Sequence, residues 1–132
     1  MNRKIEYLAD QGIVQVTTEG VYELGSELET VKAAVDKLKE HNCKKCLFDH
    51  RQTEVIVRTM EAYDRPQLYR TLGLDGTEFM AHVFSEVTDD LKFYETVCTN
   101  RGWKVQTFDD YAAAIDWLNT RRSAIKSGCV IS

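Results

Sequence analysis

The sequence predicts a single α/β domain with a mostly parallel, five-stranded sheet and covering helices. Strand-like and helix-like segments alternate along the chain, in the order strand, strand, helix, strand, helix, strand, helix, strand, helix. Such alternation is typical of sheets whose parallel strands are joined by helical crossovers. The 132 residues are 43% hydrophobic and 29% charged, as in a globular chain with a packed core. We expect the domain to span residues 1–124 and a flexible tail to follow at 125–132.

Two strands joined by a tight turn are expected at the amino terminus. Residues 4–9 alternate in character, and residues 13–17 form a β-branched segment with the same period of two. The intervening residues 10–12, Asp-Gln-Gly, favour a hairpin turn.

The first helix is predicted from its amino-terminal cap and its apolar stripe. Ser26 and Glu29 have the spacing of a capping box, in which the two side chains satisfy free amides at a helix start. The apolar residues that follow recur at helical spacing, at Leu28, Val31, Val35 and Leu38. Asn42 is expected to end this helix.

A buried strand and then a broken helix are expected in the middle of the chain. Residues 45–49 are short and apolar at the centre, which suits a buried parallel strand. Thr53 is expected to cap a helix with the apolar residues Val55, Ile56, Val57, Met60 and Tyr63. Pro66 interrupts that helix because proline is tolerated only in a first turn, and Gly73 ends the second piece.

Two further pairs of a strand and a helix complete the pattern. Residues 79–84 are apolar on both faces and predict an internal strand. Thr88 and the two aspartates after it predict a helix start, and Gly102 the helix end. Residues 103–108 alternate as a fifth strand, and Asp109 is expected to cap a last helix with the inner residues Tyr111, Ala114, Ile115 and Leu118.

Charge and hydropathy exclude several classes of partner. The formal net charge is −4, and no long basic stripe carries interleaved aromatic residues, so nucleic acid is not expected as a partner. No run of about 18 apolar residues occurs, and no apolar segment follows the charged amino terminus. We therefore expect a cytoplasmic protein without stable membrane anchoring. Its four cysteines are expected to be reduced thiols.

The carboxy-terminal half resembles a known family. Residues 93–108 contain an aromatic-Glu-Thr triplet, an Asn-Arg-Gly turn and a strand ending in phenylalanine, and residues 109–118 end in Trp-Leu. These features resemble the SpoIIAA-like family of bacterial STAS-type domains, and the order of elements fits along almost the whole chain. The resemblance implies a cytoplasmic domain without cofactor or catalytic residues that contacts protein partners.

Better-known relatives in that family include anti-anti-sigma factors, which are switched by phosphorylation. Their phosphoacceptor is a serine that directly follows an aspartate, at the start of the helix after the third strand. The corresponding stretch here runs from Asp49 to Thr53 without a serine, and Thr53 is the only nearby hydroxyl. The resemblance therefore carries no phosphoacceptor serine onto this chain.

The loops that follow the parallel strands are the candidate binding site, because ligands of open α/β sheets bind beyond the carboxyl ends of the strands. These loops are residues 49–53, residues 85–88, which begin at Ser85, and residues 108–110. Asp49 and Arg51 are candidates to bind a polar group, and the predicted helix starts at Thr53 and Thr88 offer free amides to an anion. The alternative is that Asp49 pairs with Arg51 or Arg101 and that both threonines only cap helices.

A few further motifs have structural alternatives. Cys43 and Cys46 form a C-x-x-C flanked by His41 and His50, which suggests zinc or redox chemistry. Strand geometry places His50 too far from Cys43 to share a metal, so a buried structural cysteine is expected and no metal or cofactor. His82 is expected to be a hydrogen-bonded core residue. The last four residues, from Cys129, have the form of a prenylation box, with a disordered tail as the alternative.

Three functions are compatible with these observations. The first is a non-catalytic regulatory module that binds a protein partner and forms a homodimer through exposed apolar residues of the broken helix, at Val57, Tyr63, Leu68, Tyr69 and Leu72. The second is a small apolar-ligand carrier, as in lipid-transfer α/β folds, with the break at Pro66 acting as a lid. The third is a hydrolase or transferase, which would require a deep pocket with a perturbed His50 or Asp49.

Overall fold

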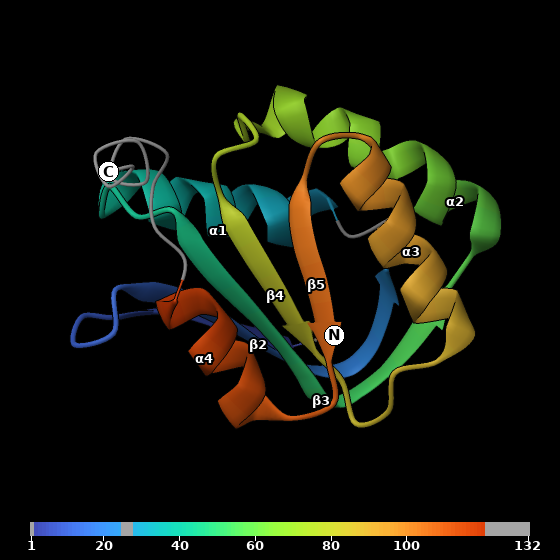
Figure 1. The fold of residues 1–132 in the computed structure, drawn as a ribbon, viewed down its shortest axis with the longest axis horizontal. Coiled ribbons are helices and arrows are strands. Elements are labelled where there is room, and N and C mark those ends of the chain that lie inside the picture. Colours follow the sequence, from blue (N-terminus) through green and yellow to red (C-terminus); the bar gives the residue numbers. More distant parts are fainter. Residues whose placement is uncertain (1, 25–27, 121–132) are drawn as a thin grey trace.

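The computed structural model describes residues 2–24 and 28–120. Its sheet contains five strands in the spatial order β1-β2-β3-β4-β5 (Figure 1). The strands are β1 (Asn2–Leu8), β2 (Ile13–Leu24), β3 (Lys45–Val57), β4 (Phe79–Val83) and β5 (Lys104–Phe108). β1 is antiparallel to β2, and the remaining neighbours are parallel. The predicted α/β class and mostly parallel sheet are confirmed.

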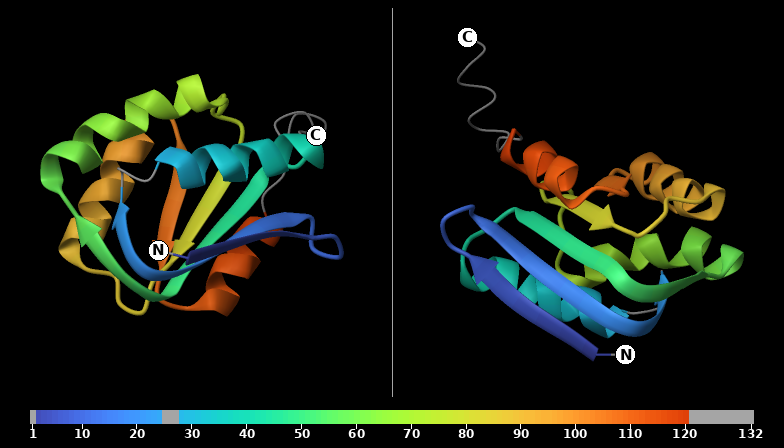
Figure 2. Two further views of the ribbon diagram at one scale, coloured as in Figure 1. Left: turned by 180° about the vertical axis from the view of Figure 1, so that it is seen from behind. Right: turned by 90° about the horizontal axis from the view of Figure 1, so that it is seen from below.

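In the part of the chain that the structure describes, four α-helices and one 3₁₀-helix connect or follow the strands. They are α1 (Leu28–Glu40), α2 (Thr59–Asp64), the 3₁₀-helix η1 (Arg65–Leu72), α3 (Asp89–Asn100) and α4 (Tyr111–Asn119). Right-handed crossovers between successive neighbouring strands place α1, η1 and α3 on one face of the sheet. Figure 2 shows α1 crossing the sheet on the side away from α4. Within the described ranges, no helix has the length and apolar character needed to cross a bilayer.

Each face of the sheet buries its own apolar core. On the first face, Phe48 of β3 and Met80 of β4 pack with Val35 of α1 and Tyr94 of α3. On the second face, α4 packs a smaller set of residues against the strands, which comprises Ile13, Leu47, Ala81, Val83, Ala114 and Leu118. The alternation of side chains along β3 and β4 thus supplies both cores.

Several local predictions are confirmed by the backbone. The hairpin turn lies between Leu8 and Ile13. Asn42 has a positive φ of 50° after α1, and Gly73 ends η1 in the left-handed conformation with φ of 114°. Gly102 likewise follows α3. The expected cap Ser26, the tail at 125–132 and the prenylation box at Cys129 lie outside the described residues.

The helix predicted from Thr53 is wrong. Residues 50–57 continue β3, and Thr53 is a strand residue that pairs with Gly20 of β2. β2 is also longer than expected, because it runs to Leu24 beside this part of β3. The physical reason is the β-branched run from Val55 to Val57, which packs well on a pleated surface and disfavours a helix.

The predicted cap of the last helix is displaced by one residue. The side chain of Asp110, rather than that of Asp109, accepts a hydrogen bond from the Ala112 amide, with 3.1 Å between Oδ1 and the nitrogen. Asp110 has the extended backbone expected of an N-cap.

Candidate functional site

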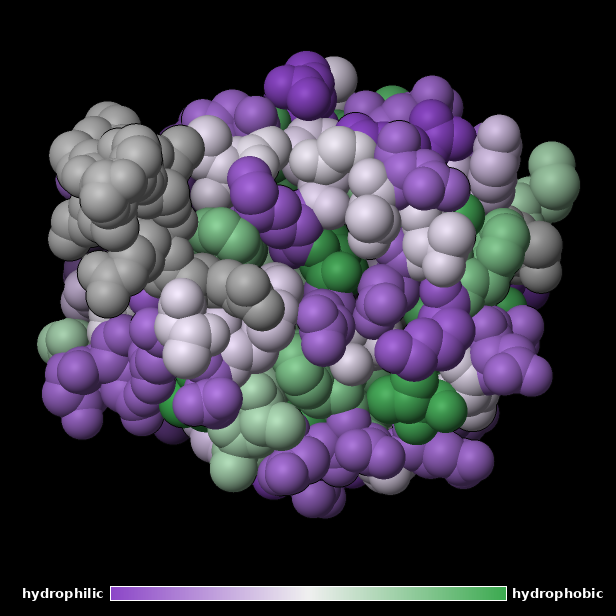
Figure 3. Space-filling view, viewed as in Figure 1, coloured by the Kyte–Doolittle hydropathy of each residue, from purple (hydrophilic) through white to green (hydrophobic). Residues whose placement is uncertain are grey.

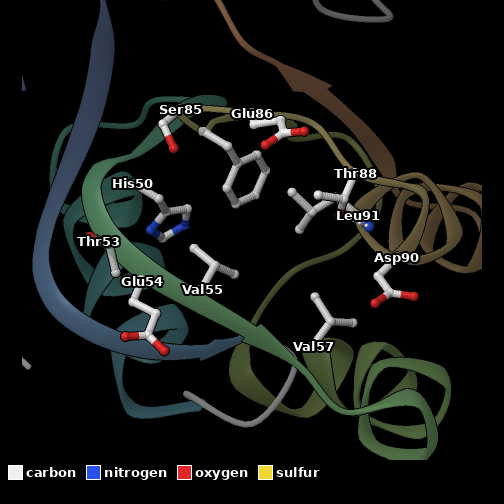
Figure 4. Close-up of a pocket in the computed structure, with 11 residues that line it drawn as sticks. His50, Thr53, Glu54, Val55, Val57, Ser85, Glu86, Thr88, Asp90 and Leu91 are labelled. Carbon is white, nitrogen blue, oxygen red and sulfur yellow. Dashed lines mark hydrogen bonds between the residues drawn. The ribbon is translucent and has the colours of Figure 1, made fainter.

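A pocket of about 350 Å³ lies beyond the carboxyl end of β4 (Figure 4). β4 ends at Val83, which pairs with Asp49 of β3, whereas β3 continues to Val57. The second half of β3 forms one wall, and the connection from β4 to α3 forms the opposite wall. This is the crevice in which open α/β sheets bind ligands.

A bulge in β3 determines which of its side chains reach the pocket. Two residues of β3, His50 and Arg51, face the single residue Thr18 of β2. One extra residue shifts the alternation of the strand by one position. His50 and Thr53 therefore contact the same Thr18 hydroxyl, although residues three apart in a regular strand point to opposite faces. Val55 continues this row along the pocket wall.

Among the described residues that line the pocket, His50 alone has a buried side-chain polar atom without a hydrogen-bond partner. Its Nδ1 lies 2.7 Å from Thr18 Oγ1, which in turn lies 2.7 Å from Thr53 Oγ1. Its Nε2 is buried and has no hydrogen-bond partner among the described residues. Figure 4 shows the imidazole directed into the pocket. Burial lowers the pKa of His50 to about 3, so the ring is neutral at pH 7.

A second buried histidine stands beside His50 in a row of stacked rings. The ring centroids of His82 and His50 are 5.7 Å apart, and Phe48 and Phe84 stack on them. Burial, with a smaller effect of His50, holds the pKa of His82 well below its ordinary value. His82 is a core residue, as predicted, but its Nδ1 makes no hydrogen bond within the described residues.

The pocket combines apolar walls with an acidic rim. The apolar side chains that line it are Val55, Val57, Phe84 and Leu91. Three exposed carboxylates, of Glu54, Glu86 and Asp90, also line it, and no lysine or arginine of the described ranges does. The described part of the chain provides no ion-pair partner for these three groups. The pocket therefore has apolar walls and a negatively charged rim.

Three of the seven sequence-predicted site residues line this pocket. Thr53 of β3 and Ser85 of the loop after β4 both line it (Figure 4). Thr88 also lines it, and its hydroxyl caps α3 by accepting from the Leu91 amide at 3.3 Å. The capping role expected for Thr88 is confirmed, whereas the one expected for Thr53 is wrong.

Asp49 and Arg51 lie on the other face of the sheet, so the prediction that they share a site with Thr53 is wrong. The guanidinium of Arg51 donates to both carboxylate oxygens of Asp49 at 2.9 Å, and it lies 4.6 Å from the Tyr111 ring centroid of α4. Burial raises the pKa of the Asp49 carboxyl, but the hydrogen bonds and charge of Arg51 outweigh burial and hold this pKa below its ordinary value. The alternative prediction of an Asp49–Arg51 ion pair is confirmed.

The two tyrosines predicted for a contact surface differ in exposure. Tyr63 is exposed on α2, and the Arg101 guanidinium lies 4.9 Å from its ring centroid. Tyr69 is buried, and its hydroxyl hydrogen-bonds that of Tyr94 of α3. Tyr69 is therefore a core residue, and its prediction as a surface residue is wrong.

The helix interruption at Pro66 packs against the core. The indole Nε1–H of Trp103 donates to the Pro66 carbonyl oxygen at 2.8 Å, and both residues are buried. Leu74 and Tyr69 fill the space between η1 and the sheet. The predicted lid over a ligand at this place is not compatible with that packing.

The C-x-x-C cysteines have separate environments. Cys46 is buried on the first face of the sheet, and burial raises the pKa of its thiol far above the usual range. The Cys43 thiol donates to the Gly12 carbonyl oxygen at 3.2 Å. The described ranges contain no group of three His, Cys, Asp or Glu residues that could hold a metal ion. A structural role of Cys46, as predicted, fits this burial.

The sequence analysis missed the groups that give the pocket its character. The sequence suggests His50 only as a neighbour of the C-x-x-C or as a perturbed catalytic group, and it predicts a helix rather than a strand at Val55 and Val57. The β-branched run was the one available signal for a longer strand. The bulge at His50 has no sequence signal, because it depends on how β3 pairs with β2.

No family model matches this chain, and no curated protein matches it. The candidate site therefore depends on the geometry of this chain alone.

Proposed function

We propose that this chain is a non-catalytic binding module whose pocket beside β3 holds a small organic molecule. The observation that carries this proposal is the buried Nε2 of His50, which faces the pocket and has no hydrogen-bond partner in the described part of the chain. A buried polar atom without a hydrogen bond costs about 1–3 kcal/mol. A ligand that supplies the missing bond recovers this free energy on binding.

The shape and lining of the pocket support the same proposal. Its volume of about 350 Å³ lies at the lower end of the range for small-molecule sites. Apolar walls with a few convergent polar groups are the usual composition of such sites. Here the uncharged polar groups include His50 and Thr53 of β3 and Ser85 of the loop after β4.

Catalysis by His50 is not favoured, although its pKa is strongly perturbed. A general base is most effective when its pKa is near the working pH. Burial lowers the pKa of His50 to about 3, which makes the ring a weak base at pH 7. The Asp49 carboxylate is bound to Arg51 on the opposite face, so it cannot assist His50.

The proposal is tested by NMR with ¹⁵N-labelled protein and a set of small amines, alcohols and carboxylates. We expect chemical-shift changes at the amides of Thr53, Ser85 and Thr88 with at least one fragment class. Ser85→Phe fills the pocket from its exposed loop and should abolish these changes. Thr96→Phe, on the exposed side of α3, is the matched control and should retain them.

Two results would contradict the proposal. One is the absence of localised shift changes with all three fragment classes. The other is a set of changes that persists unaltered in Ser85→Phe, because the ligand would then bind elsewhere.

A second candidate function is contact with a second copy of this chain through α2 and α3. Four large apolar side chains are exposed in the described residues, and three of them, Met60, Tyr63 and Phe93, lie on these two helices. Figure 3 shows apolar side chains at the right-hand edge of that view, over α2 and α3. The resemblance to STAS-type domains, which contact protein partners, supports this candidate. Sedimentation equilibrium tests it: a dimer that Met60→Lys dissociates supports the contact, and a monomer at all concentrations contradicts it.

A further inference from the structure

We infer that the pocket takes an organic ammonium ion that carries an apolar substituent. This inference rests on the proposed small-molecule function and names the chemical class of the ligand. It follows from the charge of the rim, the orientation of the His50 lone pair and the apolar walls.

The rim attracts cations. Glu54, Glu86 and Asp90 come from β3, from the loop after β4 and from the first turn of α3, so carboxylates surround the opening from three elements. Among the described residues, no lysine or arginine lines the pocket. A pocket lined by one sign of charge raises the local concentration of the opposite ion.

The hydrogen bonds of Thr18 permit Nε2 of His50 to act as an acceptor. The Thr18 hydroxyl has a single proton, and it is placed to donate to the Asp49 carbonyl oxygen at 3.4 Å. When the Thr18 proton is directed to this carbonyl oxygen, the Thr18 oxygen accepts from Thr53 and from Nδ1–H of His50, both at 2.7 Å. A neutral imidazole with its proton on Nδ1 has its lone pair on Nε2. That lone pair faces the pocket and accepts from an N–H donor.

The amino terminus of α3 does not reverse this preference. A helix start alone favours an anion, because its free amides carry partial positive charge. In α3 the first turn already bears the carboxylates of Asp89 and Asp90, and the Thr88 hydroxyl accepts from the Leu91 amide. The chain itself therefore supplies the negative charge that this helix start favours.

The apolar walls determine the other part of the ligand. Val55, Val57 and Leu91 present aliphatic surface, and Phe84 presents an aromatic ring that stacks on His50. These groups offer no further donors or acceptors. A substituent such as a phenyl ring or a short alkyl chain would bury apolar surface against them.

The test uses three probes of similar size and different charge on the full-length protein: 2-phenylethylamine, 2-phenylethanol and 3-phenylpropionate. Each is titrated at pH 7 and low ionic strength, and amide shifts are followed at Thr53, Ser85 and Thr88. We expect the amine to bind with a Kd on the order of 1 mM, as suits a fragment. It should bind about tenfold or more tightly than the carboxylate, which meets like charge at the rim.

A charge variant tests the role of the rim. Glu54→Gln with Glu86→Gln should weaken amine binding by about fivefold. Glu29→Gln with Asp116→Asn removes two exposed carboxylates on α1 and α4, outside the pocket, and should leave the Kd unchanged. This control separates the effect of local charge from that of net charge.

The outcomes distinguish the two proposals. Tighter binding of the amine than of the other two probes, together with weaker amine binding in the rim variant, supports the ammonium ligand. Equal or tighter binding of the alcohol or the carboxylate at the same amides overturns the ammonium ligand and leaves the binding function intact. No localised shift with any of the three probes overturns both.

Discussion

The buried histidines determine how this fold responds to acid. His50 and His82 are neutral in the folded protein, because burial holds their pKa values below the unfolded value near 6.5. Below pH 6.5 the unfolded chain binds protons that the folded chain does not, so stability falls as the pH decreases toward the folded pKa values. Above pH 6.5 this contribution to stability is fully present.

The predicted loss is on the order of 1 kcal/mol per histidine between pH 7 and pH 5.5. His82→Phe keeps a stacked ring in the row and removes one titrating group, so it should halve the drop measured by urea unfolding. Phe48→Leu, a change to a ring stacked on His82, should lower stability equally at both pH values. An unchanged drop in His82→Phe would show that the histidines do not cause the pH dependence.

The hydroxyl pair of Tyr69 and Tyr94 allows a second prediction for individual residues. Tyr69→Phe deprives the buried Tyr94 hydroxyl of this partner and should cost about 1–3 kcal/mol in urea unfolding. The double variant with Tyr94→Phe should cost less than the sum of the two single changes, because no hydroxyl is then left without its partner. Strictly additive costs would show that the two hydroxyls do not interact.

Among elements, the extension of β3 distinguishes the observed structure from the helix suggested by the sequence. Residues 52–57 pair with β2 alone, whereas residues 46–49 have neighbours on both sides. Native-state hydrogen exchange should therefore show protection at alternate amides in residues 52–57. Continuous protection through these residues would indicate a helix and contradict the pocket.

Gly73 and Gly12 lie in two turns at which the cost of a glycine-to-alanine substitution can be compared. Both have positive φ, but a Cβ at Gly73 would lie 2.9 Å from Val35 Cγ1, whereas one at Gly12 would meet nothing within 4 Å. Gly12→Ala should cost about 1–2 kcal/mol for the left-handed backbone. Gly73→Ala should cost a further 1–3 kcal/mol, roughly, for the overpacking against α1. Equal unfolding free energies in the two variants would contradict the packing of η1 on α1.

For the whole molecule, the sequence predicts the fold better than the site. The sequence alone predicts α1, α3 and β5, because the spacing of apolar residues in each segment matches only one type of element. The run from Val55 to Val57 fits a strand or a buried helix turn, and only pairing with β2 decides between them. Ser85 and Thr88 follow from the rule for open sheets. That rule does not predict that His50 lines the pocket, because its position depends on a bulge that arises from the pairing of β3 with β2.

The central claim is that a small organic molecule binds in the pocket at the acceptor Nε2 of His50. A long-range ¹H–¹⁵N spectrum of the histidine side chains, recorded with and without 2-phenylethylamine, tests it most directly. The account predicts an unprotonated Nε2 in the free protein whose ¹⁵N resonance moves upfield when the amine binds. A proton on Nε2 in the free protein, with no change on adding the amine, would contradict the account.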